Sequence, residues 1–182
     1  MPSDPVSAKI VVSGGFGVGK TTFVGALSEI APLTTEAALT EVSRGVDDTS
    51  AVAAKSTTTV AFDFGRVTLD GNIVLYLFGT PGQERFTFLW DDLVDGTLGA
   101  VVLVDTRRID DAYPALDYFE SAGIPLAIGV NQFPDGERYA LEEVREALGI
   151  GAGVPLVPCD ARDRTAVKGV VLALLDLVIE GA

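Results

Sequence analysis

The stretch of sequence that decides the fold reads Gly14-Gly15-Phe16-Gly17-Val18-Gly19-Lys20-Thr21. It satisfies the pattern G-x-x-x-x-G-K-[ST], follows the apolar run Ile10-Val11-Val12, and precedes a helical pattern near residues 20–30. Glycines let the backbone turn so that successive N–H groups converge on phosphate oxygens. The sequence therefore predicts a phosphate-binding loop that holds a nucleoside triphosphate.

Two side chains at the end of this loop have distinct expected roles. Lys20 is expected to reach the β- and γ-phosphates and to stabilise their charge during transfer, and Thr21 is expected to ligate Mg²⁺. The helix that begins near Lys20 points its positive dipole end at the same anion. The predicted phosphate-binding set is Gly14, Gly15, Phe16, Gly17, Val18, Gly19, Lys20, Thr21 and Thr22.

Length, composition and charge limit the class of protein. The 182 residues, 48% of them apolar, suit a single domain over residues 1–182 with a flexible start at residues 1–7. With 26 acidic and 13 basic residues the net charge is −13, which disfavours nucleic acid and anionic membrane surfaces as partners. One cysteine and no histidine leave no internal disulfide and no transition-metal site. We expect a cytoplasmic protein without a membrane-inserted segment.

Strand-like and helical patterns alternate along the chain, which is typical of a doubly wound α/β sheet. Asp70-Gly71 joins two β-rich runs and predicts a hairpin, so one strand should run antiparallel at the sheet edge. The segment from Ile30 to Thr58 has little apolar periodicity and is expected to be functional or mobile. The predicted strands are 8–13, 60–69, 73–78, 100–105, 126–130 and 154–158, and the predicted helices are near 20–30, 110–122, 137–148 and 164–179.

Two further motifs carry a resemblance to a known family. Residues 59–64 read Thr-Val-Ala-Phe-Asp-Phe, and residues 79–86 read Gly-Thr-Pro-Gly-Gln-Glu-Arg-Phe. With the phosphate loop, they make residues 8–180 resemble a Ras-like small GTPase, most closely the bacterial conservon-type GTPases related to the polarity GTPases of gliding motility. The resemblance implies a Ras-like P-loop domain with a six-stranded, mostly parallel sheet in the order 2-3-1-4-5-6, one antiparallel edge strand, and helices on both faces.

The resemblance assigns roles in the two switch segments. Thr59 matches the threonine whose hydroxyl reaches Mg²⁺ when a γ-phosphate is present, although the adjacent Thr57 and Thr58 leave the register open. Gly82 would offer its backbone N–H to the γ-phosphate, because a residue without a side chain allows that approach. Gln83 would orient the attacking water; the alternative is a solvated loop residue.

Base recognition departs from the family's usual motifs. Asn131 is in place, but Gln132 stands where a lysine usually stacks on the base, and the carboxylate of Asp135 comes one residue late. Asp135 either accepts from the guanine through a bulge at Pro134 or begins a turn with Gly136. The second base segment reads Cys159-Asp160-Ala161-Arg162, in which the Ala161 N–H would donate to guanine O6 and the Arg162 stem would cover the base.

Two more departures concern catalysis. Gly79 stands where the family has an aspartate that holds Mg²⁺ through water; Asp63 is a candidate replacement, with a solvent-facing strand residue as the alternative. Phe16 stands where small GTPases have glycine near the γ-phosphate, which indicates slow intrinsic hydrolysis. Arg44 and Arg85 are candidates for an internal catalytic arginine.

We therefore expect a signalling switch that binds GTP with Mg²⁺, hydrolyses it slowly to GDP, and changes the order of residues 31–58 and 79–95. The resemblance implies a roadblock-type regulatory protein and a sensor-kinase complex as partners. Two alternatives stay open: a nucleotide-binding scaffold without catalysis, and a P-loop ATPase, which the missing lysine at Gln132 favours.

Overall fold

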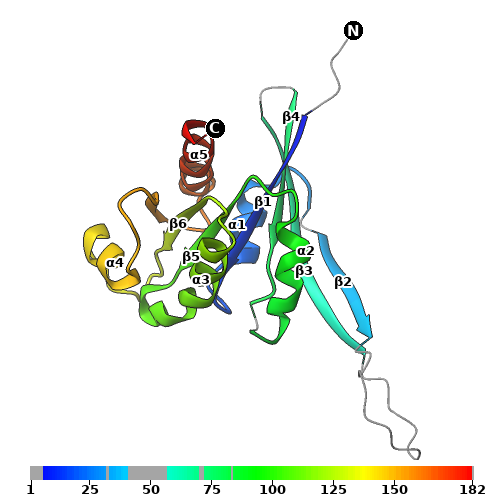
Figure 1. Ribbon diagram of the computed structural model, residues 1–182, viewed down its shortest axis with the longest axis horizontal. Coiled ribbons are helices and arrows are strands. Elements are labelled where there is room, and N and C mark those ends of the chain that lie inside the picture. The colour runs from blue at the N-terminus through cyan, green and yellow to red at the C-terminus, as the bar shows by residue number, and fades with distance from the viewer. Residues whose placement is uncertain (1–5, 32, 41–56, 70–71, 83, 182) are drawn as a thin grey trace, which may run out of the picture.

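A seven-stranded sheet forms the centre of the computed structural model, which describes residues 6–31, 33–40, 57–69, 72–82 and 84–181, without the side chains of residues 33–40, 57–61 and 84–86. The strand order is β2-β3-β4-β1-β5-β6-β7 (Figure 1). The strands are β1 (Val6–Gly14), β2 (Leu33–Thr40), β3 (Thr57–Leu69), β4 (Ile73–Gly79), β5 (Gly99–Val104), β6 (Leu126–Asn131) and β7 (Leu156–Cys159).

The direction of the strands confirms the predicted fold class. β1 pairs in parallel with β4 and β5, and β6 pairs in parallel with β5 and β7, whereas β3 is antiparallel to both β2 and β4. All six predicted strands are present in the predicted order. The prediction lacked β2, which lies in the segment expected to be irregular and which moves β3 one strand in from the edge. Its pairing with β3 depends on backbone hydrogen bonds, which apolar periodicity does not reveal.

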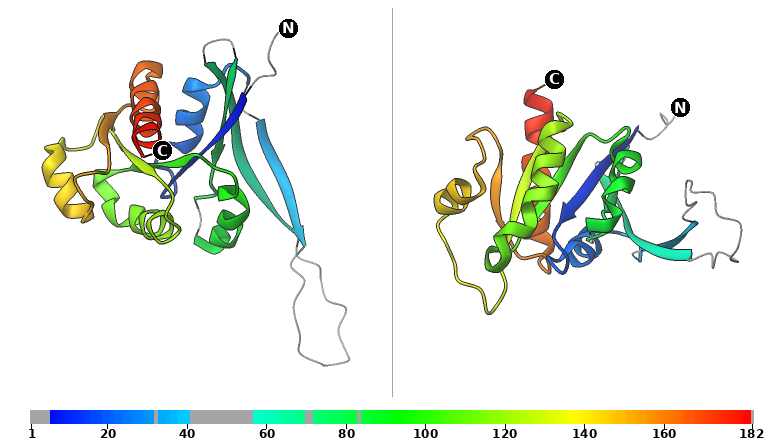
Figure 2. Two further views of the ribbon diagram at one scale, coloured as in Figure 1. Left: turned by 45° about the horizontal axis from the view of Figure 1, so that its top comes forward. Right: turned by 60° about the horizontal axis from the view of Figure 1, so that its bottom comes forward.

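Helices cover both faces of the sheet, as predicted (Figure 2). α1 (Lys20–Leu27) and α5 (Arg164–Glu180) pack on one face, and α2 (Trp90–Val94), α3 (Tyr113–Ser121) and α4 (Leu141–Leu148) pack on the other. Two 3-10 helices, η1 (Glu84–Leu89) and η2 (Thr106–Ala112), precede α2 and α3. The sequence patterns did not predict η1 or α2. Both elements are short, and Trp90 is the one buried residue of α2.

Each face of the sheet has its own apolar core. Phe23 of α1 and Leu174 of α5 pack with Ile10 and other β1 and β5 residues on one face. Trp90 and Phe119 pack with the alternate strand residues on the other face. Because β5 and β6 are buried along their whole lengths, both read as continuous apolar runs, as expected of parallel strands covered on two sides.

The two ends of β1 matter for the site. Val6 and Ser7, which were expected in a flexible start, form the beginning of β1, whereas residues 1–5 lie outside the described part of the chain. The other end of β1 leads directly into the phosphate loop, at the carboxyl edge of the parallel strands where ligands bind in open α/β sheets.

Among the described residues, no helix combines the length and apolar content needed to cross a membrane.

Candidate functional site

The phosphate loop connects the last residue of β1, Gly14, to the first residue of α1, Lys20. Gly14, Gly17 and Gly19 adopt φ values of 137°, 71° and 108°, a region that residues with a Cβ avoid. A Cβ on Gly14 would also lie 2.5 Å from the carbonyl oxygen of Leu103 in β5. The loop conformation therefore requires glycine both for its backbone angles and for its contact with the sheet.

Lys20 is buried at the centre of this loop. Its Nζ donates to the carbonyl oxygens of Gly14 and Gly15, at 2.9 and 2.7 Å. Burial lowers the pKa of Lys20 to about 8, and the nearby Asp63 carboxylate partly opposes that shift. A Cβ on Gly82 would lie 2.8 Å from the same Nζ, so the backbone at Gly82 approaches the lysine closely. An incoming phosphate would replace the two carbonyls as partners of the ammonium group.

Asp63 points into the site from β3. Its Oδ2 accepts a hydrogen bond of 2.6 Å from the Thr21 hydroxyl. Asp63 pairs with Gly79 across the β3–β4 ladder, and a Cβ on Gly79 would lie 2.9 Å from the Asp63 Cβ. The carboxylate on β3 thus lies beside Gly79, the position at which the resemblance leads one to expect an aspartate.

The hydroxyl of Thr21 and the carboxylate of Asp63 are hard oxygen donors, the kind that Mg²⁺ prefers. Within the described residues, no cluster of three or more Asp, Glu, His or Cys side chains could hold a metal ion by itself. The donor set fits a cation that takes its remaining ligands from phosphate oxygens and water.

Two adjoining cavities form a cleft along the loop. The first has a volume of about 480 Å³ and extends from the phosphate loop to Asp63 and Gly82. The second, of about 190 Å³, lies between Phe133 and Arg162. Both cavities are bordered by Gly17, Gly19 and Thr22, so a ligand with a charged chain and a flat ring system could occupy the two together.

Asn131 joins the two base segments to the phosphate loop. Its side chain is 7% exposed, donates to the Val18 carbonyl at 2.8 Å, and accepts from the Ala161 N–H at 3.0 Å. The Ala161 N–H, expected to be available to guanine O6, is therefore bonded to Asn131. Asn131 acts here as a brace between loops that are far apart in the sequence.

The structure does not bring Asp135 into the second cavity. Its carboxylate accepts from Arg107 Nη1 at 2.7 Å, and the Gly136 N–H donates to the Phe133 carbonyl at 3.1 Å. The chain turns at Pro134 and Asp135, so the turn ends at Gly136, whereas the sequence alternative had it begin at Asp135. The Arg107 guanidinium also stacks on the Phe133 ring, 3.9 Å from its centre. This arginine, rather than a bulge at Pro134, determines the direction of the Asp135 side chain.

The second base segment divides into a buried and an exposed half. Cys159 is buried in the core and lines neither cavity, and burial raises the pKa of its thiol to about 12. Asp160 and Arg162 line the cavity and bind each other, with Arg162 Nη2 2.7 Å from Asp160 Oδ2. The hydrogen bonds from Arg162 hold the pKa of Asp160 at about 2.

Of four residues expected beside Thr21 and Asp63, three have a described backbone, which lies away from both. Gln83 lies outside the described residues. The backbone of Thr59 belongs to β3 and pairs with Ala38, four residues along the strand from Asp63, which corresponds to about 13 Å. Thr57 and Thr58 lie still farther along the same strand. The side chains of all three threonines lie outside the described part of the structure.

Sequence reasoning missed the charged residues that follow β5. Asp105 is buried and accepts from both Arg107 Nε and Nη2, each at 2.9 Å, which holds the pKa of the Asp105 carboxyl below its usual range. Arg108 donates to the Phe16 carbonyl at 2.7 Å. Their position directly after a buried strand, at the carboxyl edge of the sheet, was the available signal.

Comparison with known proteins places the chain in a family. Residues 12–181 match the family described as conserved hypothetical ATP binding protein. The chain belongs to this family. The chain is also similar to an uncharacterised protein of Methanocaldococcus jannaschii. The two are 30% identical over 131 residues, which are 71% of this chain and 72% of the relative.

Among solved structures, the G-domain of FeoB from Methanococcus jannaschii superposes with a TM-score of 0.63 at 16% identity, covering 96% of this chain and 99% of that one. At this identity the likeness concerns the fold alone. The family member described here is thus a nucleotide-binding P-loop protein with a G-domain fold.

Proposed function

We propose that the protein is a small GTP-binding switch that hydrolyses GTP slowly to GDP and phosphate with the help of Mg²⁺. The observation that carries the proposal is the 2.6 Å hydrogen bond between Thr21 and Asp63, beside Gly79. A G-domain needs a carboxylate near its magnesium-binding hydroxyl, and this chain supplies one from the neighbouring strand.

Each residue of the phosphate cavity has a defined task in this proposal. Lys20 would exchange its carbonyl partners for β- and γ-phosphate oxygens, and Thr21 and Asp63 are the residues that would hold the cation. Mg²⁺, when bound, neutralises charge on the β- and γ-phosphates. Gly82 brings a backbone N–H to the γ-phosphate, and Gln83 orients water. Loss of the γ-phosphate would release the switch segments, residues 31–58 and 79–95.

The finer assignments rest on the sequence resemblance. We propose that the chain is of the conservon type, that Thr59 joins the site when a triphosphate is bound, and that a roadblock-type regulator and a sensor-kinase complex are its partners. For Thr59, the proposal requires the outer end of β3 to move toward Thr21, since its backbone lies about 13 Å along the strand from Asp63.

An ATPase is the second candidate function. The family's description names ATP, Gln132 stands in place of the stacking lysine, and Asp135 is held by Arg107 outside the base cavity. Guanine recognition depends on a carboxylate that accepts from the ring N1–H and from the exocyclic N2 amino group, so Asp135 would have to leave Arg107 to select guanine.

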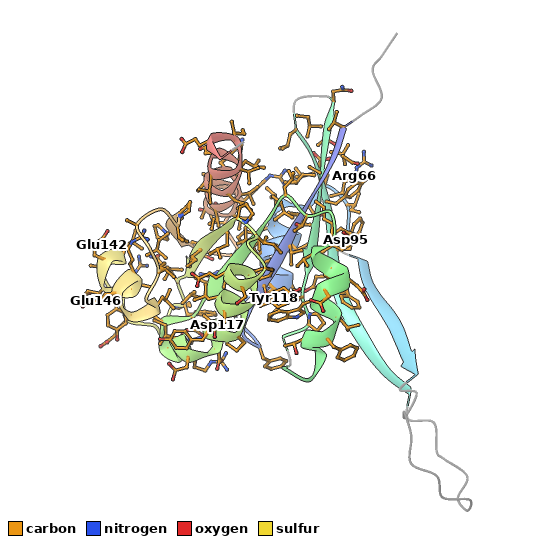
Figure 3. The ribbon with its side chains drawn as sticks, viewed as in Figure 1. Arg66, Asp95, Asp117, Tyr118, Glu142 and Glu146 are labelled. Atoms are coloured by element: carbon orange, nitrogen blue, oxygen red, sulfur yellow. The ribbon has the colours of Figure 1, made fainter. Side chains whose placement is uncertain are left out.

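To test the proposal, the protein is first freed of bound nucleotide. Fluorescent GDP, GTP and ATP analogues are then titrated onto it, with and without Mg²⁺. We expect tighter binding of the guanine analogues and a dependence on Mg²⁺ that weakens in Asp63→Asn. Asp117→Asn is the matched control, because Asp117 is an exposed carboxylate on α3 and lines neither cavity (Figure 3).

Equal or tighter binding of ATP would overturn the guanine assignment in favour of the ATPase. An unchanged Mg²⁺ dependence in Asp63→Asn would remove Asp63 from the cation site. Binding without single-turnover hydrolysis of either triphosphate would leave a nucleotide-binding scaffold as the function.

A further inference from the structure

Arg108 lies against the phosphate loop, and its ion pairs with Asp105 and Asp111 are long, at 3.9 and 3.5 Å. Its Nη2 donates to the Phe16 carbonyl at 2.7 Å, and a Cβ on Gly17 would lie 3.6 Å from the same nitrogen. Phe16 and Gly17 both border the phosphate cavity. The guanidinium is therefore next to the loop residues that would surround the β- and γ-phosphates.

The two neighbouring arginines are held in very different ways. Arg107 forms hydrogen bonds of 2.9 Å to both carboxylate oxygens of Asp105 and one of 2.7 Å to Asp135. Arg108 instead stays 3.9 Å from Asp105 and 3.5 Å from Asp111, and its side chain is 49% exposed. Among the described residues, the Phe16 carbonyl is the one acceptor of a side-chain hydrogen bond from Arg108, while the two carboxylates lie at ion-pair distance, so an incoming anion would have a neutral partner to replace.

The backbone holds Arg108 in place even though its side chain is loosely bound. Arg108 interrupts η2 with φ −144° and ψ 58°, while its N–H donates to the Asp105 carbonyl at 2.9 Å. Asp111, at the end of the same segment, packs so closely on the phosphate loop that a Cβ on Gly15 would lie 2.6 Å from the Asp111 Cβ. The segment carrying Arg108 is thus held by a turn at Asp105 and by the contact of Asp111 with the phosphate loop.

We propose that Arg108 is an internal catalytic arginine, which leaves the Phe16 carbonyl when a nucleoside triphosphate binds and donates to its β–γ bridging and γ-phosphate oxygens. A charge-assisted hydrogen bond to phosphate is stronger than one to a neutral carbonyl, which favours the exchange. The inference rests on the proposed hydrolytic function. It differs from the expectation that Arg44 or Arg85 supplies this group.

The reaction that Arg108 would assist is hydrolysis. A water oxygen forms a bond to the γ-phosphorus while the bond from that phosphorus to the β–γ bridging oxygen breaks, and the bridging oxygen leaves with the electron pair on the nucleoside diphosphate. The proton of the water passes to the released inorganic phosphate or to solvent. Negative charge grows on the bridging oxygen, so an arginine there stabilises the transition state more than the ground state.

The test compares wild type, Arg108→Ala and Arg108→Lys in single-turnover hydrolysis and in the binding of GDP with and without aluminium fluoride, which mimics the transferring phosphoryl group. We expect Arg108→Ala to lower the hydrolysis rate by about 100-fold or more and to abolish the extra affinity from aluminium fluoride, with GDP affinity changed by less than about threefold. We expect Arg108→Lys to recover only part of the rate. Arg66→Ala is the matched control, because Arg66 is an exposed arginine on β3 (Figure 3) that, unlike Arg108, has no hydrogen bond to Phe16 of the phosphate loop.

The outcomes separate the two proposals. Hydrolysis and aluminium fluoride binding that survive in Arg108→Ala would overturn the role of Arg108 and leave the proposed hydrolytic function intact. A parallel loss of GDP affinity and hydrolysis would also overturn it, because it would show that the arginine only braces the loop. If the wild-type protein binds nucleotide but hydrolyses none, the hydrolytic function fails, and the role of Arg108 fails with it.

Discussion

Single side chains decide how the loops around the cleft are held together. Asn131 bonds the Val18 carbonyl and the Ala161 N–H, which belong to the phosphate loop and to the loop after β7. Asp63 reaches Thr21 from β3, and Arg107 reaches Asp135 from η2. In each case one side chain connects segments that are distant in the sequence, so its removal should loosen both segments.

The first prediction concerns Asn131. Asn131→Ala leaves a buried carbonyl and a buried N–H without partners, so we expect a loss of roughly 1–3 kcal/mol in the free energy of unfolding. Nucleotide affinity should fall as well, because the phosphate loop and the base segment lose their brace. Urea denaturation and nucleotide titration measure the two effects. An unchanged unfolding free energy would show that water replaces the side chain at no cost.

The second prediction concerns the reactivity of Cys159, the one cysteine in the chain. Burial raises the pKa of its thiol to about 12, and alkylation requires the thiolate. We expect the native protein to resist iodoacetamide at pH 8 and the urea-unfolded protein to react fully, as measured by mass spectrometry. Fast alkylation under native conditions would mean that β7 opens readily.

At the scale of elements, close approaches between helices and strands require small residues. Gly99 begins β5, and a Cβ there would lie 2.7 Å from the Pro125 carbonyl oxygen and 2.9 Å from Leu174 Cδ1 of α5. Gly169 lies within α5 itself, and a Cβ there would meet nothing within 4 Å. Replacing glycine by alanine should therefore change the stability of the protein in opposite directions at Gly99 and Gly169.

The third prediction follows from this contrast. Gly99→Ala should destabilise the protein by about 1–3 kcal/mol, because backbone and core side chains must shift. Gly169→Ala should stabilise it by roughly 0.5–1 kcal/mol, since alanine loses less entropy than glycine in a helix. Thermal unfolding of both variants measures the effect. Equal effects of the two substitutions would show that α5 does not pack on β5 as described.

The elements also show how far the sequence could predict the fold. Strands such as β5 and β6 were recognisable because burial on both faces makes them continuous apolar runs. α5 was recognisable because its apolar residues recur at helical spacing over 17 residues. β2 and α2 were not predicted: β2 depends on backbone pairing with β3, and α2 has only five residues.

The whole molecule carries a net charge of −13 and few cations to balance it. Isolated ion pairs at the surface, such as that between Arg145 and Glu142, contribute little. Self-repulsion among the carboxylates therefore opposes the folded state at low ionic strength.

The fourth prediction follows from this charge. Raising sodium chloride from about 10 mM to about 150 mM shortens the screening length from about 30 Å to about 8 Å, so the melting temperature should rise. Circular dichroism at fixed pH 7 measures it, and sodium sulfate at equal ionic strength tests whether screening or ion-specific exclusion is responsible. A falling melting temperature would mean that favourable ion pairs outweigh the repulsion.

The sequence by itself determined the phosphate loop, the order of the six main strands and the class of ligand. Each follows from neighbouring residues: glycine spacing, apolar periodicity and turn chemistry act locally. Only the tertiary structure decided that Asp63 meets Thr21 beside Gly79, that Arg107 holds Asp135, and that Arg108 lies on the phosphate loop. These contacts depend on strand register and loop direction, which bring together residues separated by between 28 and 92 positions and leave no local pattern in the sequence.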